Sequence, residues 1–158
     1  MSEHRSLREA LGRFVTGVTV VTAASEQGPV GLTVNSFTSV SLDPALVLFC
    51  LRRDSRVGDV FESAASFAVN ILGEHQESVS KRFSGPVEER TEGVALDFGV
   101  TGAPLLADAL AYLDCDLHRR IDAGDHVIII GWVRDFEIRR AEARPLAFYG
   151  GRYAVLGR

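Results

Sequence analysis

Residues 111–130 read AYLDCDLHRRIDAGDHVIII. Apolar and polar residues alternate between Ala111 and Ile121, which predicts a strand with one buried face and one wet face. Val127–Ile130 is apolar throughout, so we expect a strand that is buried on both faces or lies in an interface. Gly124-Asp125 separates the two runs as a turn. The segment therefore predicts a long β-hairpin.

Further short β-rich segments lie on both sides of this hairpin and are separated by few helices. A capping box at Ser6–Glu9 predicts an N-terminal helix with an apolar face that reaches Phe14. Other helices are expected at Ser55–Ala64 and Glu74–Phe83, and residues 85–98 are the best candidate for a mobile loop. The remaining strands are expected at residues 18–22, 30–34, 37–40, 46–51, 66–72 and 148–156, with Phe136 and Ile138 continuing the hairpin past a bulge.

The order of these elements predicts a mainly β protein with a few helices. Regular alternation of strands and helices is absent, which argues for a small barrel rather than a doubly wound parallel sheet. A chain of 158 residues suits a single domain over 1–158.

Composition excludes several classes of protein. Hydrophobic residues make up 46% and charged residues 24%, an ordinary globular balance, and the formal net charge of −4 gives no attraction to nucleic acid. The longest uncharged stretch, Gly28–Leu42, is interrupted by polar residues and is not a membrane span, and no secretory signal is visible. Cys50 and Cys115 are expected to be free thiols in a reducing cytosol, so we expect a cytoplasmic protein.

Several well-known site motifs are missing. The sequence has no G-x-G-x-x-G after a strand, no P-loop and no G-x-S-x-G elbow. Its four histidines are scattered, and none has the spacing of a zinc ligand, so no metal site is expected.

The most unusual stretch is residues 31–41, GLTVNSFTSVS, where hydroxyl and amide side chains are dense within predicted β structure. Two interpretations stand equally. One is an edge strand and turn that happen to be rich in Ser and Thr. The other is a polar wall that offers hydrogen bonds to a flat heterocycle.

Four shorter segments favour structural interpretations when each is taken alone. Arg52–Ser55 fits a helix cap better than a phosphate site. Lys81–Phe83 complements a helix dipole. Gly124–His126 is a turn with one histidine, and Gly150–Tyr153 is a bulged terminal strand.

Taken together and in order, these segments resemble the flavin reductase family, whose fold is a Greek-key, FMN-binding split β-barrel. Members include reductase components of two-component flavin-dependent monooxygenases. The resemblance covers nearly the whole chain, and its segments are residues 14–22, 31–44, 66–72, 103–106, 124–126, 145–146 and 149–153.

The resemblance implies roles for individual residues. His126 matches a histidine beside the nicotinamide, and we count it as the catalytic candidate. The flavin ring and ribityl chain would contact Thr33, Val34, Asn35, Ser36, Ser39, Val40 and Ser41. The ribityl and phosphate groups would be held by Cys50, Leu51, Arg52 and Ser55, with Lys81, Arg82 and Phe83 at the phosphate or adenylate end. The segment that closes the site across a dimer would include Tyr149, Gly151, Arg152 and Tyr153.

Two positions depart from the family pattern. Val57 stands where many members carry a hydroxyl residue, which puts one phosphate contact in doubt. Trp132 stands where an acidic residue often follows the glycine, which puts the local surface in doubt but not the fold.

The implied function is transfer of a hydride from NADH or NADPH to FMN or FAD, with reduced flavin passing freely to a partner monooxygenase. The sequence does not distinguish the two flavins or the two nucleotides. The main alternative is a flavin-binding module without turnover, and a pyridoxamine-phosphate oxidase is a weaker one. We expect a homodimer, because Val127–Ile130 with Trp132 offers more apolar surface than one small barrel needs. Neither nucleic acid nor a membrane is expected as a partner.

Overall fold

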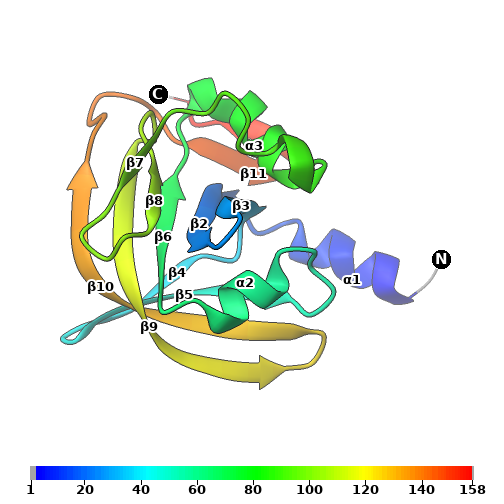
Figure 1. The fold of residues 1–158 in the computed structure, drawn as a ribbon. Helices are drawn as coiled ribbons and strands as arrows, with labels where there is room; N and C mark the ends of the chain where they lie inside the picture. Colours follow the sequence, from blue (N-terminus) through cyan, green and yellow to red (C-terminus); the bar gives the residue numbers. More distant parts are fainter. Residues whose placement is uncertain (1–2, 158) are drawn as a thin grey trace.

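A computed structural model describes residues 3–157 of the chain (Figure 1). About half of these residues belong to β-strands, and the chain also has three α-helices and two short 3₁₀ helices. In chain order the elements are α1 (Glu3–Leu11), β1 (Thr16–Gly17), β2 (Thr19–Ser25), β3 (Gly28–Val34), β4 (Thr38–Leu42), β5 (Ala45–Arg52), α2 (Gly58–Ser63), β6 (Ser66–Ile71), η1 (Glu74–Gln76), α3 (Glu77–Ser84), η2 (Val87–Glu89), β7 (Leu96–Phe98), β8 (Pro104–Leu106), β9 (Ala111–Ala123), β10 (His126–Ile138), β11 (Leu146–Tyr149) and β12 (Arg152–Val155).

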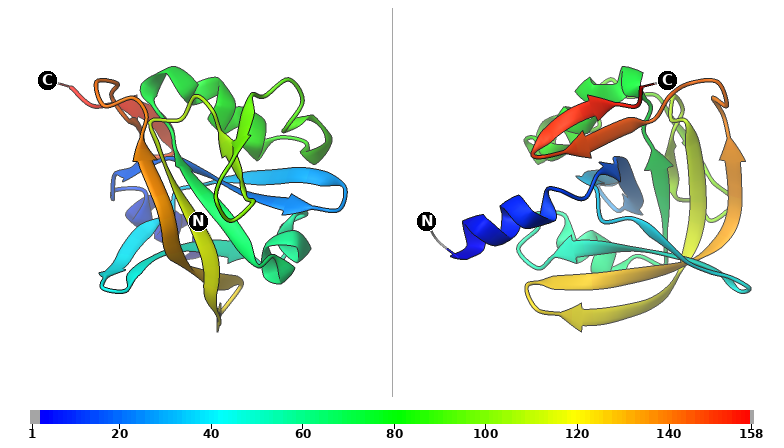
Figure 2. Two further views of the ribbon diagram at one scale, coloured as in Figure 1. Left: turned by 60° about the vertical axis from the view of Figure 1, so that its left-hand side comes forward. Right: turned by 180° about the vertical axis from the view of Figure 1, so that it is seen from behind.

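The long hairpin of β9 and β10 organises a seven-stranded antiparallel sheet, in the order β3-β2-β6-β9-β10-β5-β4. β6 pairs with the first half of β9, whereas β5 pairs with the half of β10 that is next to the turn. Register shifts at Ile130/Gly131 and Val133/Asp135 bend the hairpin between these two regions, which confirms the expected bulge. The strands curl around the core (Figures 1 and 2). Among residues 3–157 the edge strands β3 and β4 do not pair with each other, so the barrel is open.

The main core fills the inside of this curled sheet, and α2 covers one side of it. Phe49 lies at its centre and meets the rings of Phe61 and Phe67 edge to face, with centroid distances of 5.8 and 5.2 Å. Val127 and Ile129 point into this core, and Ile128 and Ile130 alternate to the half-buried face. The run 127–130 is therefore an amphipathic strand, and not one buried on both faces.

The face of β9 that the sequence predicts to be wet is largely covered, and that prediction was wrong. Asp114 is fully buried and Tyr112 nearly so. Asp114 accepts a hydrogen bond from the Thr101 amide at 3.0 Å and another from the Thr101 hydroxyl. Ala103 and Leu105, in and beside β8, pack on Tyr112. The prediction failed because alternation treats every carboxylate as exposed to solvent. Asp114 is buried instead, and hydrogen bonds from Thr101 replace those from water.

The C-terminal segment forms a hairpin where one bulged strand was expected. Gly150 and Gly151 have φ of +59° and +78°, the left-handed conformation that a tight two-residue turn requires. β11 and β12 therefore pair with each other, and β1 completes a second, three-stranded sheet. This sheet covers a smaller core that contains Phe83 and Leu146.

The helices differ from expectation mainly at their starts. α1 begins at Glu3, so Ser6 lies inside the helix rather than at its cap, and Phe14 lies beyond its end. α1 has no buried residue and extends away from the barrel (Figure 2). α2 begins at Gly58, three residues later than expected. Its N-cap is Val57, and no side chain caps it. No helix among residues 3–157 is long and apolar enough to cross a membrane.

Candidate functional site

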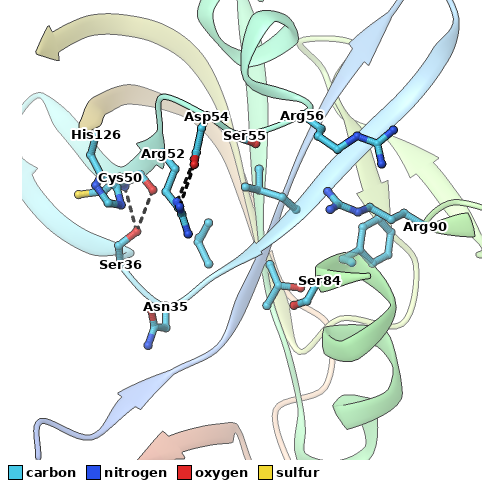
Figure 3. A pocket seen from close by; sticks show the side chains of 14 residues that line it. Asn35, Ser36, Cys50, Arg52, Asp54, Ser55, Arg56, Ser84, Arg90 and His126 are labelled. Atoms are coloured by element: carbon cyan, nitrogen blue, oxygen red, sulfur yellow. Dashed lines mark hydrogen bonds and ion pairs between the residues drawn. The ribbon is translucent and has the colours of Figure 1, made fainter. Parts of the chain in front are cut away.

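A cavity of about 570 Å³ opens between β3, the end of β5, α3 and the turn that joins β9 to β10 (Figure 3). Its size suits a small organic ligand or cofactor. It is lined by Leu32, Thr33, Val34, Asn35, Ser36, Cys50, Arg52, Asp54, Ser55, Arg56, Phe83, Ser84, Arg90 and His126. Nine of the residues named from the sequence therefore meet in one place: Thr33, Val34, Asn35, Ser36, Cys50, Arg52, Ser55, Phe83 and His126.

The wall of this cavity formed by β3 is fixed by contacts with α3. The Thr33 hydroxyl donates to the Ser80 carbonyl at 2.7 Å. The Phe83 ring packs so closely on Gly31 that a Cβ at that position would lie 2.8 Å from a ring carbon. Only glycine allows this approach, and it brings α3 against the strand. The end of β3 and the adjoining Asn35 are consequently held in place without a ligand.

Ser36 joins this wall to β5. Its hydroxyl oxygen accepts a hydrogen bond from the Cys50 amide at 2.9 Å. The bond spans the gap between the segment after β3 and the middle of β5, which positions Asn35 and Cys50 at the same end of the cavity (Figure 3). The polar stretch 31–41 is therefore partly structural, and part of it lines the cavity.

Arg52 and His126 lie opposite each other in the ladder between β5 and β10. Asp54 receives two hydrogen bonds from the Arg52 guanidinium, at 2.9 and 3.0 Å. Arg53 donates to the carbonyl oxygens of Gly124 and Asp125, which ties the segment after β5 to the hairpin turn. These contacts place one permanent cation and one imidazole on the same side of the cavity.

The imidazole of His126 is oriented by its neighbour. Nδ1 lies 2.6 Å from Oδ1 of Asp125. The hydrogen bond and the charge of His126 hold the pKa of the Asp125 carboxyl below its usual value. Because a carboxylate can only accept, we infer that Nδ1 donates in this contact, and in the singly protonated tautomer that this implies, Nε2 is left as an acceptor.

Two further cavities adjoin the first one. One, of about 590 Å³, is mainly apolar, shares Asn35 and Ser36 with it, and extends to Phe14 and Phe37. The other, of about 190 Å³, also includes Asn35 and reaches Tyr153. The Tyr153 hydroxyl lies 2.7 Å from the Ser80 hydroxyl, so the C-terminal hairpin closes this side. Asn35 is the residue at which all three spaces meet.

The other residues named from the sequence lie outside the first cavity. Leu51 points into the core, as strand alternation requires beside Cys50 and Arg52. Lys81 pairs with Glu77 at 3.0 Å, and Arg82 donates to the carbonyl oxygens of Glu89 and Glu92. Ser39, Val40 and Ser41 lie on the edge strand β4, and Tyr149, Gly151 and Arg152 lie at the C-terminal hairpin.

Sequence reasoning missed four charged or polar residues that line the cavity: Asp54, Arg56, Ser84 and Arg90. Arg56 follows Ser55 directly, and that proximity was a usable signal. Arg90 comes from the segment between η2 and β7, whose polar composition suggested only a loop. In residues 3–157 no group of three or more His, Cys, Asp or Glu side chains is arranged to hold a metal ion.

The cavity fits a flavin by the chemistry of its groups. Thr33, Asn35 and Ser36 supply hydroxyl and amide groups of the kind that can bond the heteroatoms of a flat ring and the hydroxyls of a ribityl chain. Arg52 and Ser55 supply a guanidinium and a hydroxyl for a phosphate.

Comparison with known proteins also points to flavin-binding enzymes. Residues 11–157 match the family model described as flavin reductase like domain. A Rhizobium meliloti protein named "Probable flavin reductase" is 52% identical over 84% of this chain and 43% of its own length. The reductase subunit HsaB of a flavin-dependent monooxygenase from Mycobacterium tuberculosis is 39% identical over 94% of this chain and 80% of its own. A protein of Agrobacterium fabrum named FMN reductase (NADH) is 42% identical over 98% and 87%.

A solved structure agrees with these relatives. The Streptomyces globisporus NADH:FAD oxidoreductase, in complex with NAD and FAD fragments, superposes with a TM-score of 0.92 at 38% identity, over 98% of this chain and 93% of that one. The chain spans about half the length of the first curated relatives it matches, 43% of one and 58% of another. The resemblance and the mainly β, split-barrel fold inferred from the sequence are both confirmed. The chain belongs to the flavin reductase-like family.

Proposed function

We propose that this chain is an NAD(P)H:flavin oxidoreductase, which transfers a hydride from a reduced nicotinamide nucleotide to FMN or FAD. The observation that carries the proposal is the convergence in one cavity of the polar end of β3, the Arg52–Ser55 segment and His126. These segments are far apart in the sequence, and a merely structural role for each would not bring them together. The family and the names of its members support the same reaction.

In this reaction the bound flavin supplies the redox chemistry, and the protein supplies position. Hydride transfer needs the two reacting rings within roughly 3.5 Å of each other, so fixed walls account for much of the catalysis. Thr33 and Ser36 are already held by Ser80 and Cys50, as described above. Asn35, which lies between them, can then donate its amide to a ring oxygen without rearrangement.

His126 would organise the nicotinamide rather than move a proton. With Nδ1 directed at Asp125, the free Nε2 can accept a hydrogen bond from the carboxamide NH₂ of the nicotinamide. In this proposal the contact with Asp125 makes His126 the acceptor, and the carboxamide the donor, of that hydrogen bond.

We further propose that the protein works as a homodimer. The argument for a dimer no longer rests on the run 127–130, because half of its side chains face the core. It rests on α1, whose Leu7 and Leu11 are exposed. A helix of nine residues is marginal in water by itself, so its apolar face needs a cover, and a second copy would provide one. The mainly apolar cavity between Phe14 and Asn35 opens beside this region and would be narrowed by the same contact.

The destination of the reduced flavin and the location of the protein are also proposals. A relative that serves as a monooxygenase reductase subunit supports delivery of free reduced flavin to such a partner. Two free cysteines, Cys50 and Cys115, support a location in the reducing cytoplasm.

The test is steady-state consumption of NADH or NADPH by the purified protein with FMN or FAD as acceptor. We expect nucleotide oxidation only when protein, nucleotide and flavin are all present. The four combinations also rank the two flavins and the two nucleotides. A protein that binds flavin and turns yellow, yet consumes neither nucleotide, would instead be a flavin-binding module.

A further inference from the structure

Three guanidinium groups and only one carboxylate line the main cavity, in a chain whose formal net charge is −4. Arg52 is matched by Asp54, as described above. The other two, Arg56 and Arg90, lie together at the opposite end of the cavity from His126 (Figure 3). A local excess of positive charge in an acidic protein indicates a place where an anion is held.

Arg90 is fixed by the backbone and has donors to spare. Its Nε donates to the Gly85 carbonyl at 3.0 Å and an Nη donates to the Gly31 carbonyl at 2.9 Å. A guanidinium carries five N–H groups, so several remain for a ligand. Among residues 3–157 no ion pair within 4 Å involves Arg90. The charge of Arg90 is thus positioned without being neutralised by a paired carboxylate.

Arg56 faces Arg90 and already binds an anionic group. One of its Nη atoms lies 2.8 Å from a carboxylate oxygen of Glu88, in η2. Burial, and then the like charge of Arg56, lower the pKa of Arg90 below its usual value, and the charge of Glu88 offsets part of this effect. An anion placed between the two guanidinium groups would relieve this repulsion. The carboxylate of Glu88, which does not line the cavity, would compete with such an anion for the Arg56 guanidinium.

We propose that Arg56 and Arg90 form a second anion site, which binds the outer phosphate of a flavin dinucleotide, so that the chain prefers FAD to FMN. The proposal rests on the proposed reductase function, in which Arg52 and Ser55 hold the first phosphate. In the view of Figure 3 the cavity continues from Asn35 and His126, past Arg52 and Ser55, to Arg56 and Arg90. This order is the one that a flavin ring, a first phosphate and a second phosphate would follow.

The test is a series of ligands that differ by one group at a time: riboflavin, FMN and FAD. Dissociation constants are measured by flavin fluorescence without nucleotide, for the full chain and for three variants. Arg56→Gln should weaken the binding of FAD by about tenfold and should leave the binding of FMN and riboflavin unchanged. The expected loss is at the low end for a hydrogen bond to a charged group, because Arg56 is exposed. Glu88→Gln should tighten FAD by about two- to fivefold, since it removes the competing carboxylate.

Arg140→Gln is the matched control, because Arg140 is also an exposed arginine paired with a carboxylate, that of Asp108, and it does not line the cavity. It should change none of the three constants. A melting curve of each variant checks that the fold is intact. A loss of FAD affinity on Arg56→Gln together with a gain on Glu88→Gln would establish the site.

If the protein is an active reductase but binds FAD and FMN equally, and Arg56→Gln changes neither affinity, this inference is overturned. The proposed function would still stand. If Arg56→Gln instead raises the Michaelis constant for NADH and leaves the flavin affinities unchanged, the inference is also overturned. The second anion site would then bind the diphosphate of the nicotinamide nucleotide. Absence of any flavin binding and of any NADH oxidation would overturn the proposed function itself.

Discussion

Arg52 shows how single residues prepare the cavity for its ligand. Its side chain is held by Asp54, and the next residue, Arg53, ties the backbone to the turn that carries His126. The arginine that would meet a phosphate is therefore preorganised, which reduces the entropy lost on binding.

The first prediction concerns the phosphate. Replacing Arg52 and Ser55 together by Ala should weaken the binding of FMN by about tenfold or more. The binding of riboflavin, which has no phosphate, should change very little. Stability should change by less than about 0.5 kcal/mol, because neither side chain caps α2. Flavin titrations and a denaturant melt measure the two effects. Ser63→Ala, at the end of α2 and outside the cavity, is the control. Unchanged FMN affinity would remove both residues from the site.

The second prediction concerns the nicotinamide. His126→Ala should raise the Michaelis constant for the nucleotide several-fold and leave flavin affinity nearly unchanged, since Nε2 is assigned to the carboxamide. The maximal rate should fall only modestly, because stacking shares the positioning. Steady-state kinetics with both nucleotides would show the effect. Wild-type constants would make His126 an ordinary turn residue.

The third prediction concerns pH. Cys115 is fully buried, and burial first, then Asp114 and Asp116, raise the pKa of its thiol to about 12. The folded state therefore favours the protonated thiol, and this stabilisation is complete below the unfolded value of 9.0 and is lost as pH rises toward 12. The free energy of unfolding should fall more steeply between these values for wild type than for Cys115→Ala. Parallel curves for the two proteins would contradict the raised pKa.

The site residues that the sequence identified were named through the family resemblance, since local patterns alone favoured structural roles for most of them. Thr33 to Ser36, Arg52 and His126 lie on or next to strands, and Phe83 lies on α3. Arg56 was overlooked although it follows Ser55 directly. Arg90 could not be named, because its approach to the cavity depends on how the segment between α3 and β7 packs on β3, a tertiary contact that no local pattern encodes.

At the scale of elements, the β9–β10 hairpin was predictable and its surroundings were not. Alternation and the Gly124-Asp125 turn specify the hairpin locally. The covering of Asp114 by residues near β8 depends on a contact between separate segments, and alternation cannot report it. The hairpin at Gly150-Gly151 was overlooked because two glycines within a β-rich run fit a bulge as well as a turn.

The bend in β10 supplies the next prediction. A Cβ at Gly131 would lie 2.5 Å from the Phe67 ring and 2.9 Å from Cβ of Cys115, both inside the core. Gly131→Ala should therefore destabilise the protein by about 1–3 kcal/mol through overpacking. Gly157→Ala, where a Cβ meets nothing within 4 Å, should have little effect. Chemical denaturation compares them, and equal stability would mean that the bend is not constrained by packing.

At the scale of the whole molecule, three cavities meet at Asn35, and exposed apolar residues lie nearby on α1. Light scattering at micromolar concentration should give twice the mass of one chain. Leu7→Ser with Leu11→Ser should shift the mass toward that of one chain, whereas Val100→Ser, at an even more exposed apolar position between β7 and β8, should not. A monomeric wild type would contradict the dimer.

The central claim is that this open barrel carries a hydride from nicotinamide to flavin in the cavity between β3, β5 and α3. It is tested most directly by mixing the protein with FMN or FAD and excess NADH or NADPH under anaerobic conditions, and following the visible absorbance of the flavin. The account predicts rapid bleaching that requires the protein and is slowed by the double replacement of Arg52 and Ser55 at subsaturating FMN. Bleaching no faster than in a protein-free mixture, with both flavins and both nucleotides, would contradict it.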